Sequence, residues 1–425
     1  MKKGVDRNYL ALMMEGTFFT GGMAVLSTSG AIALFINTMT GSHTLIGLAV
    51  TLQALSISSG QLFGAPFVKT IRKLPKTLFK LMLVPRFVCV LMAVPLLFGV
   101  SGQWSVTIFL ILFAIFWLGD GFTSVGWAEL CARAVKFELR GHMMGMLTTV
   151  GGFLSLLVGF LLAWLLATPT LTDEIRFALI FILAGCLFLL SAVFILPVRD
   201  PSPLSKKEKY NIKKFYAKVP SIIRHSKPLQ HVLIARIPSY VGFASVSFLV
   251  VFGANALLLS DAHVSWLVYA NIVGGIIGGV LLGEASRRYG NKSVILWSNF
   301  GVVIAMIMAV LLAMHPSLGY LWLFLLCVLG SVTASNWFGY LNYILDIAPK
   351  EERSEYQIIG QSIGIPFSFA GVALGALVDA HGYVAMFVIC GCFALFSIGL
   401  SFRLLSKGKV AVHAGEEERE KGSSE

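Results

Sequence analysis

The sorting of basic residues between long hydrophobic stretches constrains the fold of this chain more than any other feature. Twelve such stretches lie at residues 8–36, 45–68, 77–99, 104–130, 142–166, 176–196, 229–259, 264–283, 293–314, 318–345, 356–378 and 383–405. Each can cross a bilayer, because a hydrocarbon core of about 30 Å requires about 20 helical residues. Backbone N–H and C=O groups have no water to bind in lipid, so we expect every stretch to be helical.

The connectors between these stretches differ in charge. Of the 33 Lys and Arg residues, only Arg176 falls on the side of the odd-numbered connectors. Loops rich in Lys and Arg stay in the cytoplasm when a membrane protein inserts. We therefore expect a multi-pass protein of the cell membrane, with both termini and the even-numbered connectors in the cytoplasm.

Composition excludes several classes of protein. Hydrophobic residues make up 57% of the chain and charged residues 13%, against about 25% charged in soluble proteins. The net charge of +12 is spread over connectors, so we expect membrane lipid rather than nucleic acid as its partner. No cysteine has zinc-type spacing with histidine, and no phosphate-binding loop is present. We expect no metal, no cofactor, no ATP-driven step and no enzymatic activity.

A weak internal repeat divides the chain. Residues 120–140 align with 333–353 at an offset of 213, and each segment ends the fourth stretch of its half. The segments 64–73 and 283–292 also occupy the same connector in the two halves. We expect two pseudo-symmetric six-helix halves at 1–196 and 229–405, a basic cytoplasmic linker at 197–228 that includes a short amphipathic helix, and a charged tail at 406–425.

This pattern resembles the major facilitator superfamily of secondary transporters over essentially the whole chain. In the second half, Gly283, Arg288, Gly290 and Lys292 stand where the loop motif of that family has Gly, a basic residue, Gly and a basic residue. The first copy departs from the motif, with Val68 at the usual position of Asp. The resemblance implies a cytoplasmic gate built from the connectors; its residues are Gly64, Lys69, Arg72, Arg140, Gly283, Arg288, Gly290, Lys292 and Arg353.

The resemblance also implies a central cavity lined by the first, fourth, seventh and tenth stretches, which opens alternately to each side of the membrane. Aromatic, hydroxyl and charged residues recur there at helical spacing, which suits a cavity better than a lipid-facing surface. The candidate cavity residues are Glu15, Phe19, Arg86, Asp120, Trp127, Arg236, Tyr240, Trp337 and Tyr340. The aromatic members favour an amphipathic or sugar-like solute.

Four ionisable residues at membrane depth give the sharpest functional signal. A charge at the centre of a membrane helix costs about 2.5 to 3.5 kcal/mol on insertion scales, so it is seldom present without a role. Similar depth makes two pairings possible, Arg86 with Asp120 in the first half and Glu15 with Arg236 between the halves. Two interpretations stay open: the pairs are structural and never titrate, or they lie on a proton or solute path.

We expect a monomeric secondary active transporter that moves a small solute by alternating access and couples it to protons, with uptake or efflux left open. Asp120 is the first candidate for the proton-binding residue and Glu15 the second. A lipid flippase or a non-transporting sensor on the same scaffold is the alternative, because a fold alone does not choose between such functions.

Overall fold

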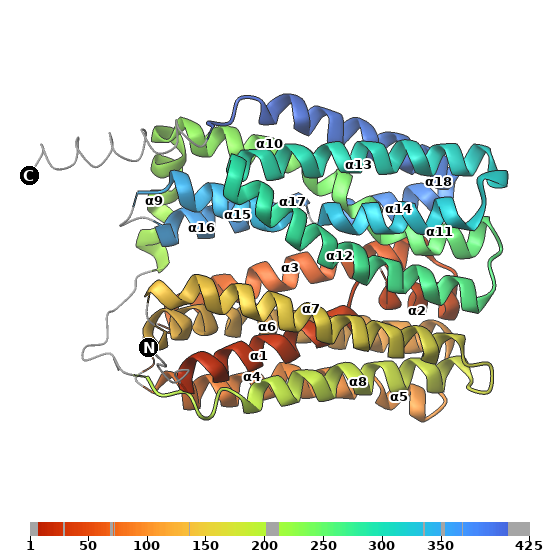
Figure 1. Cartoon of the computed structure of the whole chain (residues 1–425), viewed down its shortest axis with the longest axis horizontal. Coiled ribbons are helices and arrows are strands. Elements are labelled where there is room, and N and C mark those ends of the chain that lie inside the picture. Colours follow the sequence, from red (N-terminus) through yellow and green to blue (C-terminus); the bar gives the residue numbers. More distant parts are fainter. Residues whose placement is uncertain are drawn as a thin grey trace, which may run out of the picture. The chain divides into compact units, whose positions relative to one another are not determined.

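The computed structural model describes residues 7–28, 30–68, 71, 73–135, 137–200, 212–334, 336–349, 353–367 and 369–406, and all regular elements in these ranges are helical (Figure 1). The chain divides into two compact units. The first contains Met1–Ser42, Leu52–Asn211 and Ser260–Tyr269, and the second contains His43–Thr51, Ile212–Leu259 and Ala270–Glu425. Two long helices, α3 and α12, contribute residues to both units.

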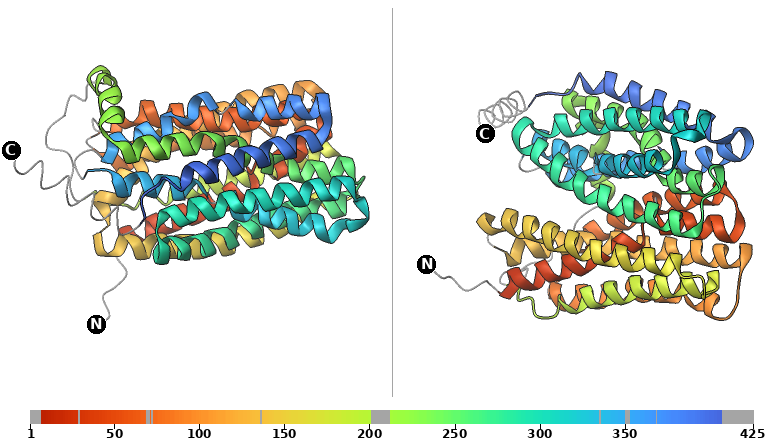
Figure 2. Two further views of the ribbon diagram at one scale, coloured as in Figure 1. Left: turned by 90° about the horizontal axis from the view of Figure 1, so that it is seen from above. Right: turned by 45° about the vertical axis from the view of Figure 1, so that its right-hand side comes forward.

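The helices of the first unit run side by side (Figure 2). They are α1 (Arg7–Val25), α2 (Ala31–Thr40), α3 (His43–Val68, from Leu52 onward), α4 (Leu74–Leu91), α5 (Val94–Leu97), α6 (Gly102–Ala134), α7 (Phe137–Ala167) and α8 (Asp173–Val193). Helix α1 packs against α7 and α8, and α4 packs against α6 and α8. Local sequence sets the ends: the Thr172 hydroxyl accepts the Ile175 N–H and begins α8.

The second unit is built in the same way. Its elements are α9 (Ile212–His225), α10 (Lys227–Ala244), η1 (Ser245–Phe248), α11 (Leu249–Ala256), α12 (Asp261–Tyr289, from Ala270 onward), α13 (Asn291–Met314), η2 (Pro316–Leu318), α14 (Gly319–Ala334), α15 (Asn336–Ile347), α16 (Arg353–Ser362), α17 (Gly364–Phe367) and α18 (Ala370–Ser401). Helix α18 packs against α10 and α13, and α13 also packs against α14 and α15. Helix α9 lies within the predicted linker, and its residues Val219, Ile222 and Ile223 pack on the core of this unit.

The predicted fold class is confirmed, with adjusted boundaries. Within the described residues, ten helical stretches are long and apolar enough to cross a membrane. One of them, Ile358–Ser401, spans 44 residues and covers most of the last two predicted stretches. The first predicted stretch, 8–36, instead forms α1 and α2, with a non-helical break between Val25 and Ala31. Gly30 and hydroxyl residues occupy this break, where the Thr28 hydroxyl bonds the Gln53 side chain at 3.1 Å.

Helix α18 consists of two segments that run in opposite directions. Gly382 separates them, with a backbone φ of 78° that residues other than glycine rarely adopt. Three hydrogen bonds trace the path of this part of the chain. Gly360 bonds Arg236, Tyr383 bonds Asn255, and Ser397 bonds Ala235. Asn255 lies near the end of α11, whereas Ala235 and Arg236 lie in the middle of α10, so the chain crosses the unit and comes back.

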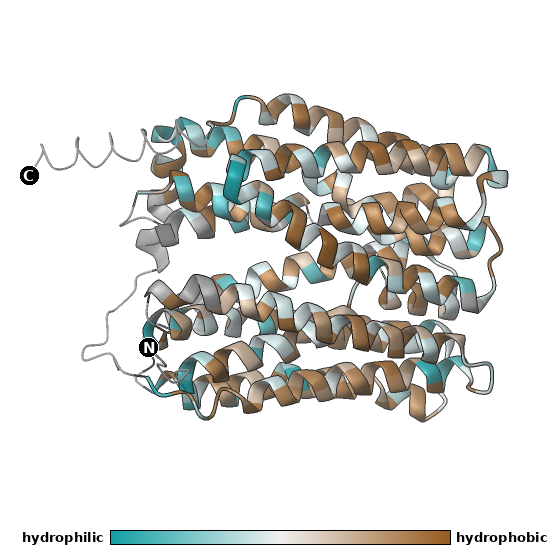
Figure 3. Cartoon of the chain, viewed as in Figure 1, coloured by the Kyte–Doolittle hydropathy of each residue, from teal (hydrophilic) through white to brown (hydrophobic). Residues whose placement is uncertain are grey.

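The helix surfaces match a lipid environment. Hydrophobic residues cover most of the length of the helices, and hydrophilic residues gather near their ends (Figure 3). Large apolar side chains stay exposed on the bundle, including Phe153 at 64%, Phe160 at 59% and Phe396 at 62%. In a membrane these side chains contact acyl chains, so their exposure needs no partner protein.

Candidate functional site

A buried ion pair forms the centre of the candidate site in the first unit. The Arg86 Nη2 atom of α4 donates to Glu15 Oε1 of α1 at 2.7 Å, and both side chains are only 3% exposed. The Ser191 hydroxyl of α8 donates to the same oxygen at 2.9 Å. Arg86 Nη1 donates to the Phe188 carbonyl at 3.0 Å. Three helices thus share one charged cluster away from solvent.

Asp120 of α6 lies near this pair but takes no part in its hydrogen bond. The side chain is buried, with 8% exposure, and it lies within electrostatic range of both Arg86 and Glu15. Among the residues that the structure describes, none forms a hydrogen bond or an ion pair with its carboxylate. The cluster therefore holds two carboxylates and one guanidinium.

Two glycines fix the position of Asp120. A Cβ on Gly119 would lie 2.8 Å from Pro85 Cβ of α4, and a Cβ on Gly121 would lie 2.2 Å from the Ile57 carbonyl oxygen of α3. Helix α6 can approach both neighbours only because these positions lack a side chain. The carboxylate is thereby held next to α4, where Arg86 follows Pro85.

The pairing that helix depth made possible is not the one that these residues form. Arg86 bonds Glu15 rather than Asp120, and Glu15 is bonded within its own unit to Arg86 and Ser191 rather than to Arg236. Depth along a helix can be read from sequence, whereas the direction of a side chain around the helix axis depends on packing. Sequence reasoning also missed Ser191, since a lone hydroxyl in an apolar helix is a weak signal.

The two aromatic candidates of the first unit, Phe19 and Trp127, lie in different surroundings. The Phe19 ring centroid lies 5.9 Å from Arg86 Cζ and 5.4 Å from the ring of Phe188, so Phe19 belongs to the cluster. Trp127 instead packs against an apolar core that includes Leu12 and Leu130. Its Nε1 is buried and has no hydrogen-bond partner among the described residues.

The second unit contains a buried arginine between two tyrosines. Arg236 of α10 is 7% exposed, and its Cζ lies 5.2 Å from the Tyr240 ring and 5.5 Å from the Tyr340 ring. Its Nη1 donates to the Gly360 carbonyl at 2.9 Å. Trp337 lies on α15, the helix of Tyr340, but its side chain is outside the described residues.

The Tyr340 hydroxyl points into a buried polar network rather than toward an accessible surface. It lies 2.7 Å from the Ser239 hydroxyl, which in turn lies 2.7 Å from the Ser397 hydroxyl and bonds Asn299 at 2.9 Å. Ser397 donates to the Ala235 carbonyl. This network joins α10, α13, α15 and α18, and sequence reasoning did not find it.

The predicted gate residues have distinct roles in the structure. Gly64 allows close packing, because a Cβ there would lie 2.5 Å from the Phe122 carbonyl oxygen, whereas the space next to Gly283 is open. Gly290 has a φ of 85° and precedes α13. Lys292 Nζ donates to the Phe402 and Leu404 carbonyls at 2.9 and 2.6 Å, which caps the end of α18.

Arg288 is 61% exposed and pairs with Glu284, four residues earlier on α12, so it lies on the surface of its own helix. The other predicted gate residues are less fully described. Lys69 and Arg72 lie outside the described residues. Arg140 and Arg353 lie on α7 and α16, with side chains that are likewise outside the described set.

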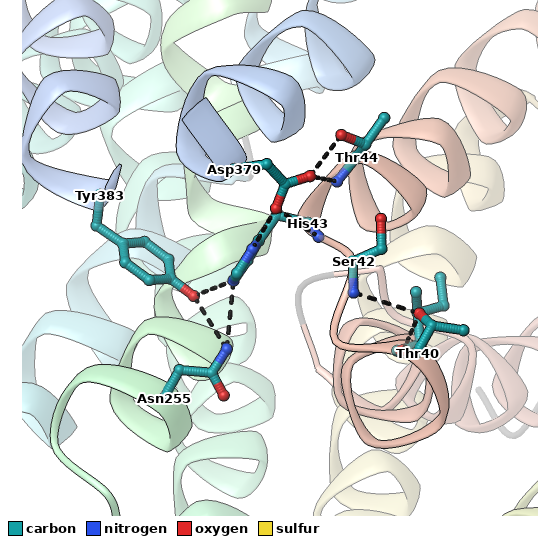
Figure 4. Close-up of polar contacts among 8 residues, drawn as sticks. Thr40, Ser42, His43, Thr44, Asn255, Asp379 and Tyr383 are labelled. Atoms are coloured by element: carbon teal, nitrogen blue, oxygen red, sulfur yellow. Dashed lines mark hydrogen bonds and ion pairs between the residues drawn. The ribbon is translucent and has the colours of Figure 1, made fainter. Parts of the chain in front are cut away.

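A further polar cluster, unforeseen in the sequence, joins the start of α3 to the middle of α18 (Figure 4). His43 Nδ1 lies 2.7 Å from Asp379 Oδ1, and His43 Nε2 lies 2.5 Å from the Tyr383 hydroxyl. The Thr44 N–H and hydroxyl donate to Asp379 Oδ2 at 3.0 and 2.6 Å. Asn255 completes the cluster, with Nδ2 3.3 Å from His43 Nε2. Asp379 thus caps the first turn of α3.

Comparison with known proteins agrees with this architecture. Residues 232–425 match the family model of the Major Facilitator Superfamily. No curated protein sequence matches the chain significantly.

Solved structures match over nearly the whole length. A crystal structure of a D-xylose-proton symporter has a TM-score of 0.74 at 14% identity, covering 95% of this chain and 98% of that chain. The xylose transporter XylE from E. coli, in a partially occluded inward-open conformation, gives 0.71 at 14% identity with the same coverage. The nucleoside transporter NupG gives 0.63 at 12% identity, covering 93% and 98%. At such identities the likeness is one of fold: this multi-pass membrane protein has the fold of these transporters over most of its length, and its residues 232–425 match the family model of the Major Facilitator Superfamily.

Proposed function

We propose that this protein is a proton-coupled secondary transporter of a small solute that works by alternating access. One observation carries the proposal: two buried carboxylates, Glu15 and Asp120, adjoin a single buried guanidinium, Arg86. Ionisable groups at membrane depth commonly mark proton or substrate paths.

The charge balance of this cluster favours proton binding. With all three groups ionised the cluster carries one excess negative charge, and one proton on either carboxylate makes it neutral. The proton belongs to the coupled pair rather than to one residue, because each carboxylate feels the other. Arg86 bonds Glu15 in the described state, and protonation of Glu15 would free Arg86 to attract Asp120.

Such an exchange of partners can be linked to transport. Suppose that Arg86 pairs with Glu15 in one conformation and with Asp120 in another. A proton that binds one conformation more tightly than the other then shifts the equilibrium between them. Asp120 is held by the close contacts of Gly119 and Gly121, so a change at the cluster is transmitted to α3 and α4. We also propose that both termini are cytoplasmic, on the distribution of Lys and Arg.

Proteoliposomes with an imposed pH gradient test the proposal against a panel of sugars, nucleosides and organic acids. We expect gradient-driven accumulation by the wild type, and we expect Asp120→Asn to abolish accumulation while solute exchange without a gradient persists. Asp173→Asn is the matched control, because Asp173 pairs with Arg176 at the start of α8 and its side chain is 45% exposed.

Unchanged pH dependence in both Asp120→Asn and Glu15→Gln would make the cluster structural. Movement of labelled lipid, with no movement of any solute in the panel, would favour the flippase alternative instead.

A further inference from the structure

Arg236 differs from Arg86 in having no counter-charge among the side chains that the structure describes. Both guanidinium groups are at least nine-tenths buried and lie in stretches that can cross a membrane. Arg86 is neutralised by Glu15 at 2.7 Å. Arg236 has a carbonyl oxygen and two tyrosine rings around it, and no ion pair with any carboxylate in the described residues.

The described carboxylates of the second unit bind partners other than Arg236. Those whose side chains are described are Glu284, Asp346 and Asp379. Glu284 binds Arg287 and Arg288, Asp346 accepts a hydrogen bond from Asn291, and Asp379 binds His43 and Thr44. Each is therefore held by partners other than Arg236.

A buried charge without a partner is costly in a low-dielectric setting, and it is retained where a mobile ion or ligand supplies the opposite charge. The Gly360 carbonyl offers only a dipole, and the tyrosine rings offer the weaker attraction of their faces. The remaining donors of the guanidinium fork match the two oxygens of a carboxylate.

The surroundings of Arg236 are shaped by close contacts. A Cβ on Gly364 would lie 2.2 Å from the Tyr240 hydroxyl oxygen, so only glycine lets α17 approach this ring. Tyr240 is partly exposed, unlike Tyr340, which is 2% exposed. The partly exposed Tyr240 ring therefore provides an apolar face beside the charge of Arg236.

We infer that the solute is an organic anion whose carboxylate binds Arg236 and whose apolar part lies on the Tyr240 ring. This inference rests on the proposed transport function and deepens it. It replaces the sugar-like solute expected from the aromatic residues alone, because a neutral solute would leave Arg236 without a counter-charge.

Thermal stability of the purified protein in detergent tests the inference without any gradient. The probes are benzoate, acetate and succinate, each matched with its amide (benzamide, acetamide, succinamide) at constant ionic strength. We expect at least one carboxylate to raise the unfolding midpoint of the wild type while its amide does not. In Arg236→Gln the apparent affinity for that carboxylate should fall at least about tenfold, as for the loss of charge-assisted hydrogen bonds.

Failure of every carboxylate to stabilise the wild type beyond its amide overturns the inference, as does equal stabilisation of Arg236→Gln. Asp120→Asn separates the two proposals: it should keep the carboxylate effect even though it loses gradient-driven transport.

A second measurement guards against a folding defect in Arg236→Gln. Without added carboxylate, Arg236→Met should match or exceed the wild-type unfolding midpoint, because it removes an unneutralised charge. Arg86→Met should lower the midpoint, because it leaves Glu15 buried without its cation. A large loss of stability in Arg236→Met alone would show that Arg236 is a structural residue.

Discussion

Arg86 and Glu15 are 71 positions apart in the sequence, and a 2.7 Å hydrogen bond joins them between α4 and α1. Neither charge could stay buried alone at low cost, so each residue is retained through the other. The Ser191 hydroxyl and the Phe188 carbonyl satisfy further atoms of the pair from α8. The pair therefore ties together three helices of the first unit.

This relationship predicts a non-additive effect on stability. Arg86→Met should lower the free energy of unfolding by about 3 to 5 kcal/mol, because it leaves Glu15 charged and buried without its cation. The double variant with Glu15→Gln should recover most of that loss. Thermal unfolding midpoints of the single and double variants check the expectation, and simple addition of the two losses would contradict it.

The contact between Gly121 and Ile57 predicts a packing defect. Gly121→Ala should destabilise the protein by about 1 to 3 kcal/mol, because the new methyl group overlaps the Ile57 carbonyl and forces α3 and α6 apart. Gly145→Ala is the control, since no atom lies within 4 Å of its Cβ position. Unfolding midpoints should fall for the first variant and stay level or rise for the second.

The cap on α18 predicts unequal roles for two basic residues of one connector. Lys292→Met should cost about 1 kcal/mol, since two terminal carbonyls lose a charged donor. Arg288→Met should change stability little, because its pair with Glu284 is exposed. Equal losses in thermal unfolding would show that the cap contributes nothing beyond a surface charge.

The cluster around His43 predicts a further loss of stability. Asp379→Ala removes the acceptor of the Thr44 N–H and hydroxyl and should cost about 1 to 2 kcal/mol. His381→Ala is the control, because His381 is exposed and lies two residues away on the same helix. Limited proteolysis near the start of α3 should increase in the first variant alone, and no difference between the two would argue against the cap.

The charge distribution predicts the topology. Cysteines introduced at Ser42, Ser101, Ser260 and Ser317 should react with impermeant reagents added outside intact cells, whereas those at Ser205 and Ser293 should not. Cys186 and Cys392 are exposed and should first be replaced by serine. Labelling of Ser205 and Ser293 alone would reverse the proposed orientation.

Local properties could be predicted from sequence and relationships between distant residues could not. Membrane helices can be recognised from sequence because they are runs of consecutive hydrophobic residues. The depth of Glu15 or Arg86 in the membrane follows from its position within such a run. Their partnership does not, because it depends on how helices rotate when they pack. His43, Asn255 and Asp379 lie in three separate stretches or their ends, and nothing local marks them as neighbours.

Gly382 also determines how often the last part of the chain crosses the membrane. A continuous helix over Ile358–Ser401 would be about 66 Å long, more than twice the thickness of a hydrocarbon core. The positive φ at Gly382 turns this stretch into a hairpin, which adds one crossing to the chain. A reporter fused after residue 425 would thus emerge on one face of the membrane or the other according to the conformation of a single glycine.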